Sequence, residues 1–311
     1  MTRHAIYGLT LDVDFPLHEA GSVAVDGEAD VTIRSAAPFD EWQEQPGGEV
    51  LLDFETTDPW YTLVRLPDGS FHFRVHSVCD YWISADTSQV TLAMHRSAAT
   101  GMDAVMTTGT LLSLLLFLRG SSVFHGSAVD VDGRAFAFIG HSGQGKTTMA
   151  TLFCAEGASV ITDDVLVIDD LATAPSARRG SRELRLRTGI EEVAARVTGA
   201  STRTSADERL VLAPEATMSD AVPLAAIVIP APSRDGSPLL FRKLRPMDAT
   251  LALMTFPRLM GWRTEAARRD LLAAASAIAS RVPVVVARVP WGPPFEDELA
   301  NKLSDFLSQA D

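Results

Sequence analysis

Hydrophobic positions are distributed differently in the first hundred residues and in the rest of the chain. Up to about residue 98 they form short runs in which apolar and polar side chains partly alternate, as they do in half-buried β-strands. Two such runs, 61–66 and 70–75, flank Pro67-Asp-Gly69, which is a strong hairpin signal. Further strand candidates are 6–15, 31–34, 50–54, 79–84 and 90–95. The pattern predicts a smaller, mainly β N-terminal domain at residues 1–100.

Beyond residue 100 the apolar runs are longer. The stretch 101–120 predicts a buried connecting helix, and 121–311 then alternates between strand-like and helix-like patterns. Strands are expected at 122–131, 134–139, 158–169, 224–229, 239–244 and 282–289, and helices at 146–156, 247–260, 264–280 and 296–308. This alternation predicts an α/β domain whose sheet is covered by helices on its faces. The polar stretch 201–209 is expected to be a mobile loop.

The composition narrows the class of protein. The 311 residues carry a formal net charge of −13, and residues 1–60 hold thirteen Asp and Glu against two Arg, which disfavours general nucleic-acid binding. Cys79 and Cys154 are too few for a disulfide framework or a metal site of their own. The apolar run 111–118 is too short to span a bilayer, and the N-terminus lacks a signal-peptide pattern. We therefore expect a cytoplasmic protein without nucleic-acid or membrane partners; oligomerisation stays open.

The stretch Gly140-His-Ser-Gly-Gln-Gly-Lys-Thr147 has the clearest chemical meaning. It fits the phosphate-binding loop G-x-x-x-x-G-K-[ST] without a mismatch, and it lies between a strand pattern and a helix pattern, as that motif requires. Its glycines permit the tight turn that points backbone N–H groups at phosphate oxygens. We expect a nucleotide site here, and the alternative is a chance match. The residues expected to contact the nucleotide are Gly140, His141, Ser142, Gly143, Gln144, Gly145, Lys146, Thr147 and Thr148.

Two acidic residues downstream add a second group of candidate site residues. Asp163 and Asp164 interrupt the strand pattern at 158–169, which places them at a strand end. In P-loop enzymes the loop lysine contacts the β- and γ-phosphates, the loop Ser or Thr binds Mg²⁺, and a carboxylate completes the metal site or accepts a proton. We therefore assign Lys146 to the phosphates and Thr147 to the Mg²⁺ of a bound Mg-ATP. The alternative for the acidic pair is a solvated turn.

Five arginines gather within ten positions of this otherwise acidic chain. They are Arg178, Arg179, Arg182, Arg185 and Arg187. Guanidinium groups hold phosphates and carboxylates in a bidentate manner, so the segment Arg178–Arg187 could dock a peptide or small-protein substrate. A solvated loop explains the same composition equally well.

His125, the phosphate loop and the Asp163-Asp164 pair together resemble the kinase core of the HPr kinase/phosphorylase family. The resemblance is close over about 45 residues and looser over 121–311. It implies a P-loop kinase domain related to phosphoenolpyruvate carboxykinase, which uses ATP and Mg²⁺ to phosphorylate a serine hydroxyl. It further implies that Asp163 binds the metal, that Asp164 is the general base, and that His125 orients this base. The chain is also similar to relatives that phosphorylate lasso-peptide precursors.

Two features depart from the pattern of that family. Thr148 stands where bifunctional members carry an acidic residue, and no R-G-x-G-[IL] segment follows at the expected distance. Phosphorylase activity is therefore not expected. Two other functions would use the same loop: a nucleotide-gated binding or regulatory protein, and a kinase that acts on a sugar or another small alcohol.

Overall fold

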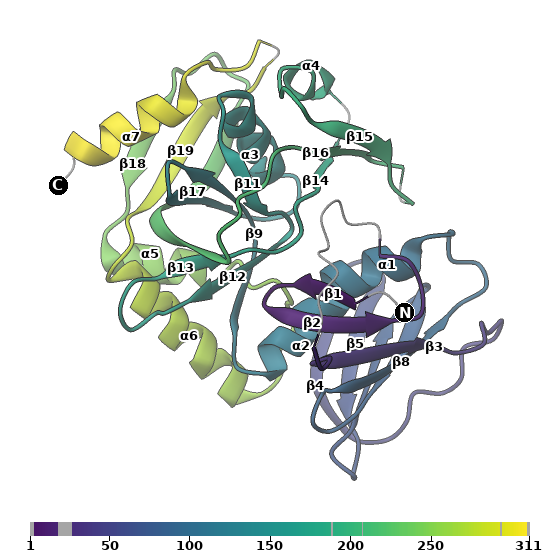
Figure 1. The fold of residues 1–311 in the computed structure, drawn as a ribbon. Helices are drawn as coiled ribbons and strands as arrows, with labels where there is room; N and C mark the ends of the chain where they lie inside the picture. The colour runs from purple at the N-terminus through teal and green to yellow at the C-terminus, as the bar shows by residue number, and fades with distance from the viewer. Residues whose placement is uncertain (1–2, 18–26, 188, 207, 293, 310–311) are drawn as a thin grey trace. The chain divides into compact units, whose positions relative to one another are not determined.

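A computed structural model describes residues 3–17, 27–187, 189–206, 208–292 and 294–309 of the chain. The chain divides into two compact units. One comprises Met1–Gly120 with Leu259–Asp270, and the other comprises Ser121–Arg258 with Leu271–Asp311. Each unit contains a large β-sheet, and the fold as a whole is mixed α/β and rich in sheet (Figure 1).

The N-terminal unit is built on a sheet with the strand order β1-β2-β3-β8-β7-β6-β5-β4. Its strands are β1 (Arg3–Ile6), β2 (Leu9–Val13), β3 (Val31–Ser35), β4 (Glu49–Glu55), β5 (Pro59–Arg65), β6 (Phe71–Val75), β7 (Cys79–Ile83) and β8 (Gln89–Met94). The predicted hairpin at Pro67-Asp-Gly69 is confirmed, because β5 and β6 pair antiparallel with Leu63 opposite Phe73. Alternating burial along these strands explains why the hydrophobic pattern identified them.

The apolar stretch at 101–120 forms the predicted buried helix, with one irregular turn. It consists of α1 (Met102–Met106), a π-helical turn η1 (Thr107–Leu111) and α2 (Leu112–Leu118). Residues 259–270, which the hydrophobic pattern had grouped with 121–311, belong to the same unit as this helix. In this unit the Tyr61 hydroxyl bonds with the Met260 backbone, and the ring of Trp262 stacks on Phe117 with 4.1 Å between centroids.

The second unit contains a mixed sheet with the strand order β10-β9-β12-β13-β17-β19-β18, in which β11 also pairs with β9, and β10 with β17. Its strands are β9 (Ser122–Val131), β10 (Arg134–Ile139), β11 (Ser159–Thr162), β12 (Val165–Asp169), β13 (Ser176–Arg178), β17 (Ala221–Ser233), β18 (Leu240–Lys243) and β19 (Val284–Pro290). Two of its strand pairs, β10–β17 and β17–β19, are parallel. The strands expected at 122–131 and 134–139 are confirmed as β9 and β10, which pair antiparallel as a hairpin.

Helices cover both faces of this second sheet (Figure 1). On one face α3 (Lys146–Ala155), α4 (Glu191–Ala194) and α7 (Leu299–Gln309) pack with strand residues such as Phe138 and Val228. On the other, α5 (Pro246–Leu253) and the C-terminal part of α6 (Glu265–Ala279) pack against Ile227 and Ile229. Cys154 is buried on α3, and burial raises the pKa of its thiol to about 12. Among the described residues, no helix is long and apolar enough to cross a membrane.

Two expectations for the second unit are wrong. The stretch 201–209 contains a strand where a mobile loop was expected, because β15 (Ser201–Thr204) pairs with β16 (Leu210–Ala213), which also pairs with β14 (Leu184–Leu186). Cross-strand pairing with the apolar β16 compensates for the polar composition of β15. The helix predicted at 247–260 ends at Leu253, since Pro257 shortly afterwards cannot continue it.

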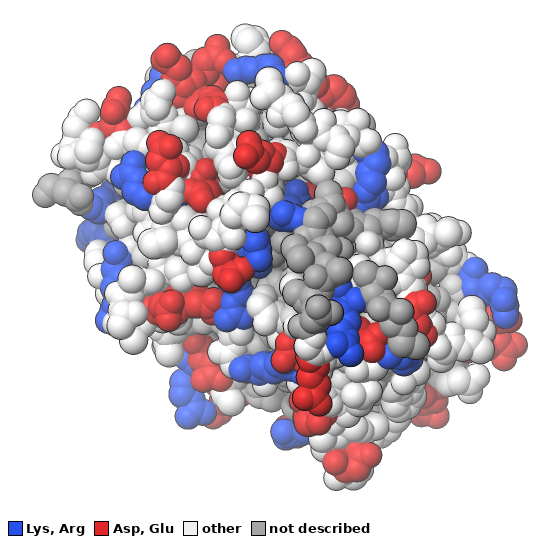
Figure 2. Space-filling view, viewed as in Figure 1, with Lys and Arg blue, Asp and Glu red and all other residues white. Residues whose placement is uncertain are grey.

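Charged side chains of both signs are interspersed on the face that Figure 2 shows. Some charged residues are paired, for example Arg196 with Asp297 at 2.7 Å within the second unit. The strongly acidic composition of the first sixty residues therefore does not turn this face into a surface of one sign.

Candidate active site

The phosphate loop directly follows β10 and ends where α3 begins, in the strand–loop–helix order that the motif requires. Gly143 and Gly145 have φ angles of 82° and 92°, a region in which side chains other than glycine are strained. Gly145 is the residue before the helix, so the first N–H groups of α3 have no partner within the helix. Such groups, together with the positive end of the helix, suit a phosphate.

Lys146 lies at the centre of this loop. Its side chain is buried, and its Nζ donates a hydrogen bond to the backbone oxygen of His141 at 2.8 Å. Burial lowers the pKa of the ammonium group to about 8, while the nearby Asp163 and Asp164 act in the opposite direction. The lysine and both carboxylates therefore share one electrostatic site.

Two side chains, Gln144 of the loop itself and Arg187, hold the loop in shape. The Gln144 side chain accepts a hydrogen bond from the His141 backbone N–H at 2.7 Å and donates one to the Pro230 carbonyl on β17 at 2.8 Å. Arg187 donates to the Ser142 hydroxyl at 3.0 Å. These contacts mean that the loop is braced on both sides before any ligand arrives.

Asp163 is surrounded by neutral hydrogen-bond donors. Its Oδ1 accepts from the hydroxyls of Ser127 at 2.5 Å and Thr147 at 3.0 Å, and its Oδ2 accepts from the Arg185 backbone N–H at 3.1 Å. Only 3% of this residue is exposed. Burial raises the pKa of its carboxyl group, and the hydrogen bonds offset only part of that shift. We call the group Ser127, Thr147 and Asp163 the hydroxyl side of the site.

Asp164 instead faces the guanidinium group of Arg258 and the imidazole ring of His125. Its carboxylate lies 2.7 Å from Arg258 Nη2 and 3.3 Å from His125 Nδ1, and a third of its side chain is exposed. Burial raises the pKa of Asp164, but Arg258 and then His125 outweigh burial and hold this pKa well below its usual range. We call the group His125, Asp164 and Arg258 the cation side of the site.

A tight reversal between β11 and β12 separates the two carboxylates. The Val165 N–H donates to the Asp163 carbonyl at 2.9 Å, and the Thr162 hydroxyl donates to the Val165 carbonyl at 2.7 Å. Asp164 takes a left-handed conformation with φ of 70°, which Asp and Asn tolerate better than most residues. The reversal gives neighbouring residues different surroundings.

The donor set on the hydroxyl side fits Mg²⁺. Carboxylate and hydroxyl oxygens are its preferred protein ligands, and it is commonly held by one or two carboxylates together with substrate phosphates. Thr147 and Asp163 are already joined by a hydrogen bond at the phosphate loop. In the described part of the chain, no group of three or more His, Cys, Asp or Glu forms a metal cage of its own. A metal here would therefore depend on the phosphates for its remaining ligands.

The remaining loop residues lie around this centre. His141 is exposed, and its ring contacts the edge of Phe256 with 4.9 Å between centroids. Thr148 is in the first turn of α3, one residue after Thr147. His125 and the acidic pair lie near the end of β10 as well, because Ile139 pairs with Gly126 and His125 pairs with Val165. The predicted loop residues, His125 and the acidic pair are therefore grouped where β10 ends.

The arginine cluster of the sequence does not form one patch. Arg178 pairs with Asp169 at 2.6 Å, and Arg179 pairs with Asp220 at 2.6 Å. The backbone of Arg185 and the side chain of Arg187 instead contact the phosphate site. Of these four arginines, Arg185 and Arg187 are therefore the ones that contribute to the site.

Two residues of the site, Ser127 and Arg258, were not identified from the sequence. Arg258 follows Pro257 after α5 and is 94 positions from Asp164, and Ser127 is one of many serines in strand patterns. A sequence signal for Ser127 could have been its position two residues after His125, on the same face of β9. Arg258 is placed only by tertiary structure.

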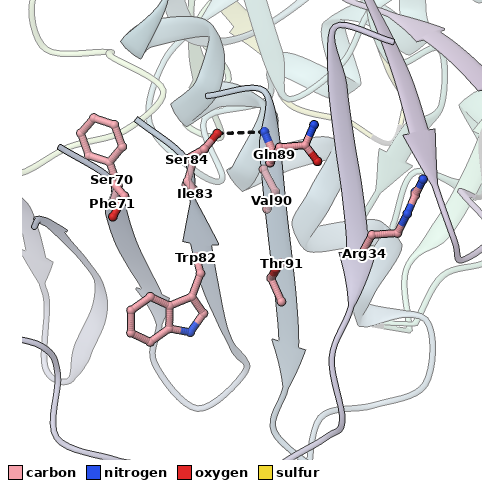
Figure 3. A pocket seen from close by; sticks show the side chains of 9 residues that line it. All are labelled: Arg34, Ser70, Phe71, Trp82, Ile83, Ser84, Gln89, Val90 and Thr91. Carbon is pink, nitrogen blue, oxygen red and sulfur yellow. Dashed lines mark hydrogen bonds between the residues drawn. The ribbon is translucent and has the colours of Figure 1, made fainter. Parts of the chain in front are cut away.

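The N-terminal sheet has a hollow of its own, formed by β3, β6, β7 and β8 and their ends (Figure 3). Its charged residue, Arg34, pairs with Asp12 at 2.9 Å. Trp82 lies in the hollow, and the Gln89 N–H donates to the Ser84 hydroxyl at 2.9 Å. None of the residues predicted to bind nucleotide lines this hollow.

Comparison with known proteins adds little to this geometry. No protein-family model matches the sequence, and no curated protein matches it. Among solved structures, the chain is similar to the Hpr(Ser) kinase/phosphatase from Coxiella burnetii, with 12% identity and a TM-score of 0.29. The match covers 60% of this chain and 88% of that one.

Proposed function

We propose that this protein is an ATP-dependent P-loop kinase that transfers the γ-phosphoryl group to a serine-type hydroxyl of a peptide or small protein. The observation that carries the proposal is that two neighbouring carboxylates with different partners lie beside one phosphate loop. Asp163 is bonded to the loop hydroxyl of Thr147, and Asp164 is directed to His125 and Arg258. Phosphoryl transfer needs one group for the metal and one for the incoming hydroxyl.

The hydroxyl side and Lys146 would hold the triphosphate. Mg²⁺ bound by Thr147 and Asp163 would supply positive charge to the β- and γ-phosphate oxygens. The Lys146 ammonium group would leave the His141 carbonyl and donate to the same oxygens. The N–H groups at the start of α3 would donate to the phosphates as well. Together these donors favour the negative charge that moves toward the β–γ bridging oxygen during transfer.

The cation side would hold the acceptor. Asp164 would accept a hydrogen bond from the acceptor hydroxyl, so that its oxygen attacks the γ-phosphorus while the bond to the bridging oxygen of ADP breaks. The proton passes from the hydroxyl to Asp164 and then to solvent. Because the pKa of Asp164 is held low, this carboxylate is a weak base. It therefore acts chiefly by orienting the hydroxyl, which is sufficient for a loose transition state.

Mass spectrometry of candidate acceptors after incubation with Mg-ATP tests the proposal. The acceptor panel contains serine peptides with internal and C-terminal serine, small proteins and sugars. We expect a gain of one phosphoryl group on a serine-containing peptide or protein, and no gain with Lys146→Ala. The matched control is Lys302→Ala, since Lys302 makes a surface ion pair on α7.

Two outcomes would count against this function. Phosphorylation of sugars alone would assign the same chemistry to a small alcohol. Transfer of the phosphoryl group only to water, with every acceptor, would favour a nucleotide-gated binding protein.

A separate measurement concerns the reverse reaction. Efficient formation of pyrophosphate from phosphorylated acceptor and inorganic phosphate would show that phosphorylase activity is present after all.

A further inference from the structure

An indole ring lies against the phosphate loop on the flank opposite the carboxylates. Trp291 immediately follows β19, and its backbone N–H donates to the Ser233 carbonyl at the end of β17 at 2.8 Å. A Cβ atom placed on Gly145 would come within 2.6 Å of the Trp291 ring. The ring is partly exposed, and Phe295 contacts it edge-to-face with 5.9 Å between centroids. Gly145 is therefore required both by its backbone angle and by this aromatic side chain.

The topology of the sheet separates the two flanks of the loop. The strand β10, which leads into the loop, pairs with β9 on one side and with β17 on the other. His125 and the acidic pair come from the β9–β12 flank, whereas Trp291 comes from the β17–β19 flank. Since β10, β17 and β19 are parallel, their carboxyl ends meet at one edge of the sheet, where ligands of α/β proteins commonly bind.

A nucleotide has two ends that must be accommodated along this edge. In the proposed function the γ-phosphate lies beside the acidic pair on the β9–β12 flank. The nucleoside end must then extend away from the carboxylates, and Trp291 is the aromatic surface next to the loop in that direction. Aromatic side chains stack with every nucleobase because each base has a π-face.

We infer that Trp291 is the platform on which the base of the bound nucleoside triphosphate stacks. The inference rests on the proposed nucleotide site and adds a base subsite to it. It predicts that the protein distinguishes a nucleoside triphosphate from inorganic tripolyphosphate, because only the former reaches Trp291. It also predicts that Trp291 contributes similarly to the binding of ATP and GTP, since stacking is tolerant of base identity.

Calorimetric titration with Mg-ATP and with Mg-tripolyphosphate tests this subsite. Trp291→Leu removes the π-surface and keeps an apolar side chain, whereas Trp291→Phe keeps a smaller aromatic ring. We expect the Leu variant to lose about tenfold or more in ATP affinity, the Phe variant to lose only about two- to threefold, and both to bind tripolyphosphate as the wild type does. Trp60→Ala is the control, because Trp60 is 57% exposed on the N-terminal unit.

Each alternative result has a distinct meaning. Equal losses for ATP and tripolyphosphate would overturn the inference and show that the indole only supports the loop around Gly145. Equal ATP affinity in the Leu and Phe variants would overturn stacking as well. If the wild type binds neither probe, the nucleotide site itself is refuted. Circular dichroism of each variant establishes that a loss of affinity is measured on folded protein.

Discussion

The hydroxyl side and the cation side of the site differ although they are built from adjacent residues. Asp163 is almost fully buried among neutral donors, and the pKa of its carboxyl group is raised. Asp164 is a third exposed, faces Arg258 and His125, and has a pKa well below its usual range. Two identical side chains thus acquire opposite electrostatic properties from their surroundings.

The difference shows how a single backbone reversal can place two adjacent aspartates in environments that shift their pKa values in opposite directions. A buried carboxylate with a raised pKa is poorly stabilised as an anion, so a cation that arrives with the substrate would be attracted to it. A carboxylate already paired with arginine gains less from such a cation. Under the proposed function, this difference favours Asp163 for the metal and Asp164 for the acceptor hydroxyl, and variants of each side test that proposal.

The largest effect is expected for Asp163→Asn. The amide keeps the shape of the side chain but removes the charge that a metal needs, so transfer should fall by about 10³-fold or more. Nucleotide affinity measured against Mg²⁺ concentration should shift to higher Mg²⁺. The control is Asp132→Asn in the β9–β10 turn, which should keep the wild-type rate. An unchanged Mg²⁺ dependence would remove Asp163 from the metal site.

Asp164→Asn should lower the rate by about 10²-fold, which is the lower range for loss of a group that handles the acceptor proton. Unlike the Asp163→Asn variant, the Asp164→Asn variant should bind Mg-ATP with the wild-type affinity. Calorimetry and single-turnover kinetics on the same preparation separate binding from transfer. If both variants lose Mg-ATP affinity to the same extent, the division between the two sides is wrong.

Local patterns were sufficient to predict much of this arrangement. His125, the phosphate loop and the acidic pair all lie within forty positions, on consecutive strands and one helix, so their order along the chain already indicated that they could meet. Most strands of the N-terminal sheet were predicted, and along strands such as β2 and β3 burial alternates with period two. Both successes depend on contacts between near neighbours in the sequence.

Residues brought in by tertiary structure could not be predicted in this way. Arg258 reaches Asp164 across 94 positions, and Trp291 reaches Gly145 from the end of β19. The strands β13, β14 and β15 are three or four residues long and contain Arg, Ser or Thr, so their hydrophobic pattern is too short to distinguish them from loop. Their pairing partners, rather than their own composition, determine that they are strands.

A third prediction tests whether the positive charge of Arg258 next to Asp164 is needed for transfer. Arg258→Met removes the charge near Asp164 while keeping an unbranched apolar side chain, and we expect about a tenfold loss in kcat with little change in the KM for ATP. Arg258→Lys should restore part of the rate, since a cation returns without the planar guanidinium geometry. The control is Arg196→Met, which breaks a surface ion pair with Asp297. A loss that appears only in the KM for ATP would place Arg258 at the phosphates instead.

The smallest effect concerns stability, where the two sides should respond to pH with opposite signs. Asp164 has a lowered pKa in the folded protein, so its stabilising contribution is present above the unfolded pKa of about 3.8 and is lost as pH falls through the folded value. Asp163 has a raised pKa, so its contribution is present below about 3.8 and is lost as pH rises through the folded value.

Urea unfolding of metal-free protein between pH 3 and pH 7, with a chelator present, measures both contributions. Asp164→Asn should lower the free energy of unfolding most at pH 7, by at most about 1 kcal/mol because the ion pair is partly exposed, and the loss should shrink toward pH 3. Asp163→Asn should be least costly at pH 7 and cost more as pH falls. Asp132→Asn, which has a similar positive φ without an arginine partner, should show neither trend. Parallel pH curves for Asp163→Asn and Asp164→Asn would mean that the reversal between β11 and β12 does not separate their environments.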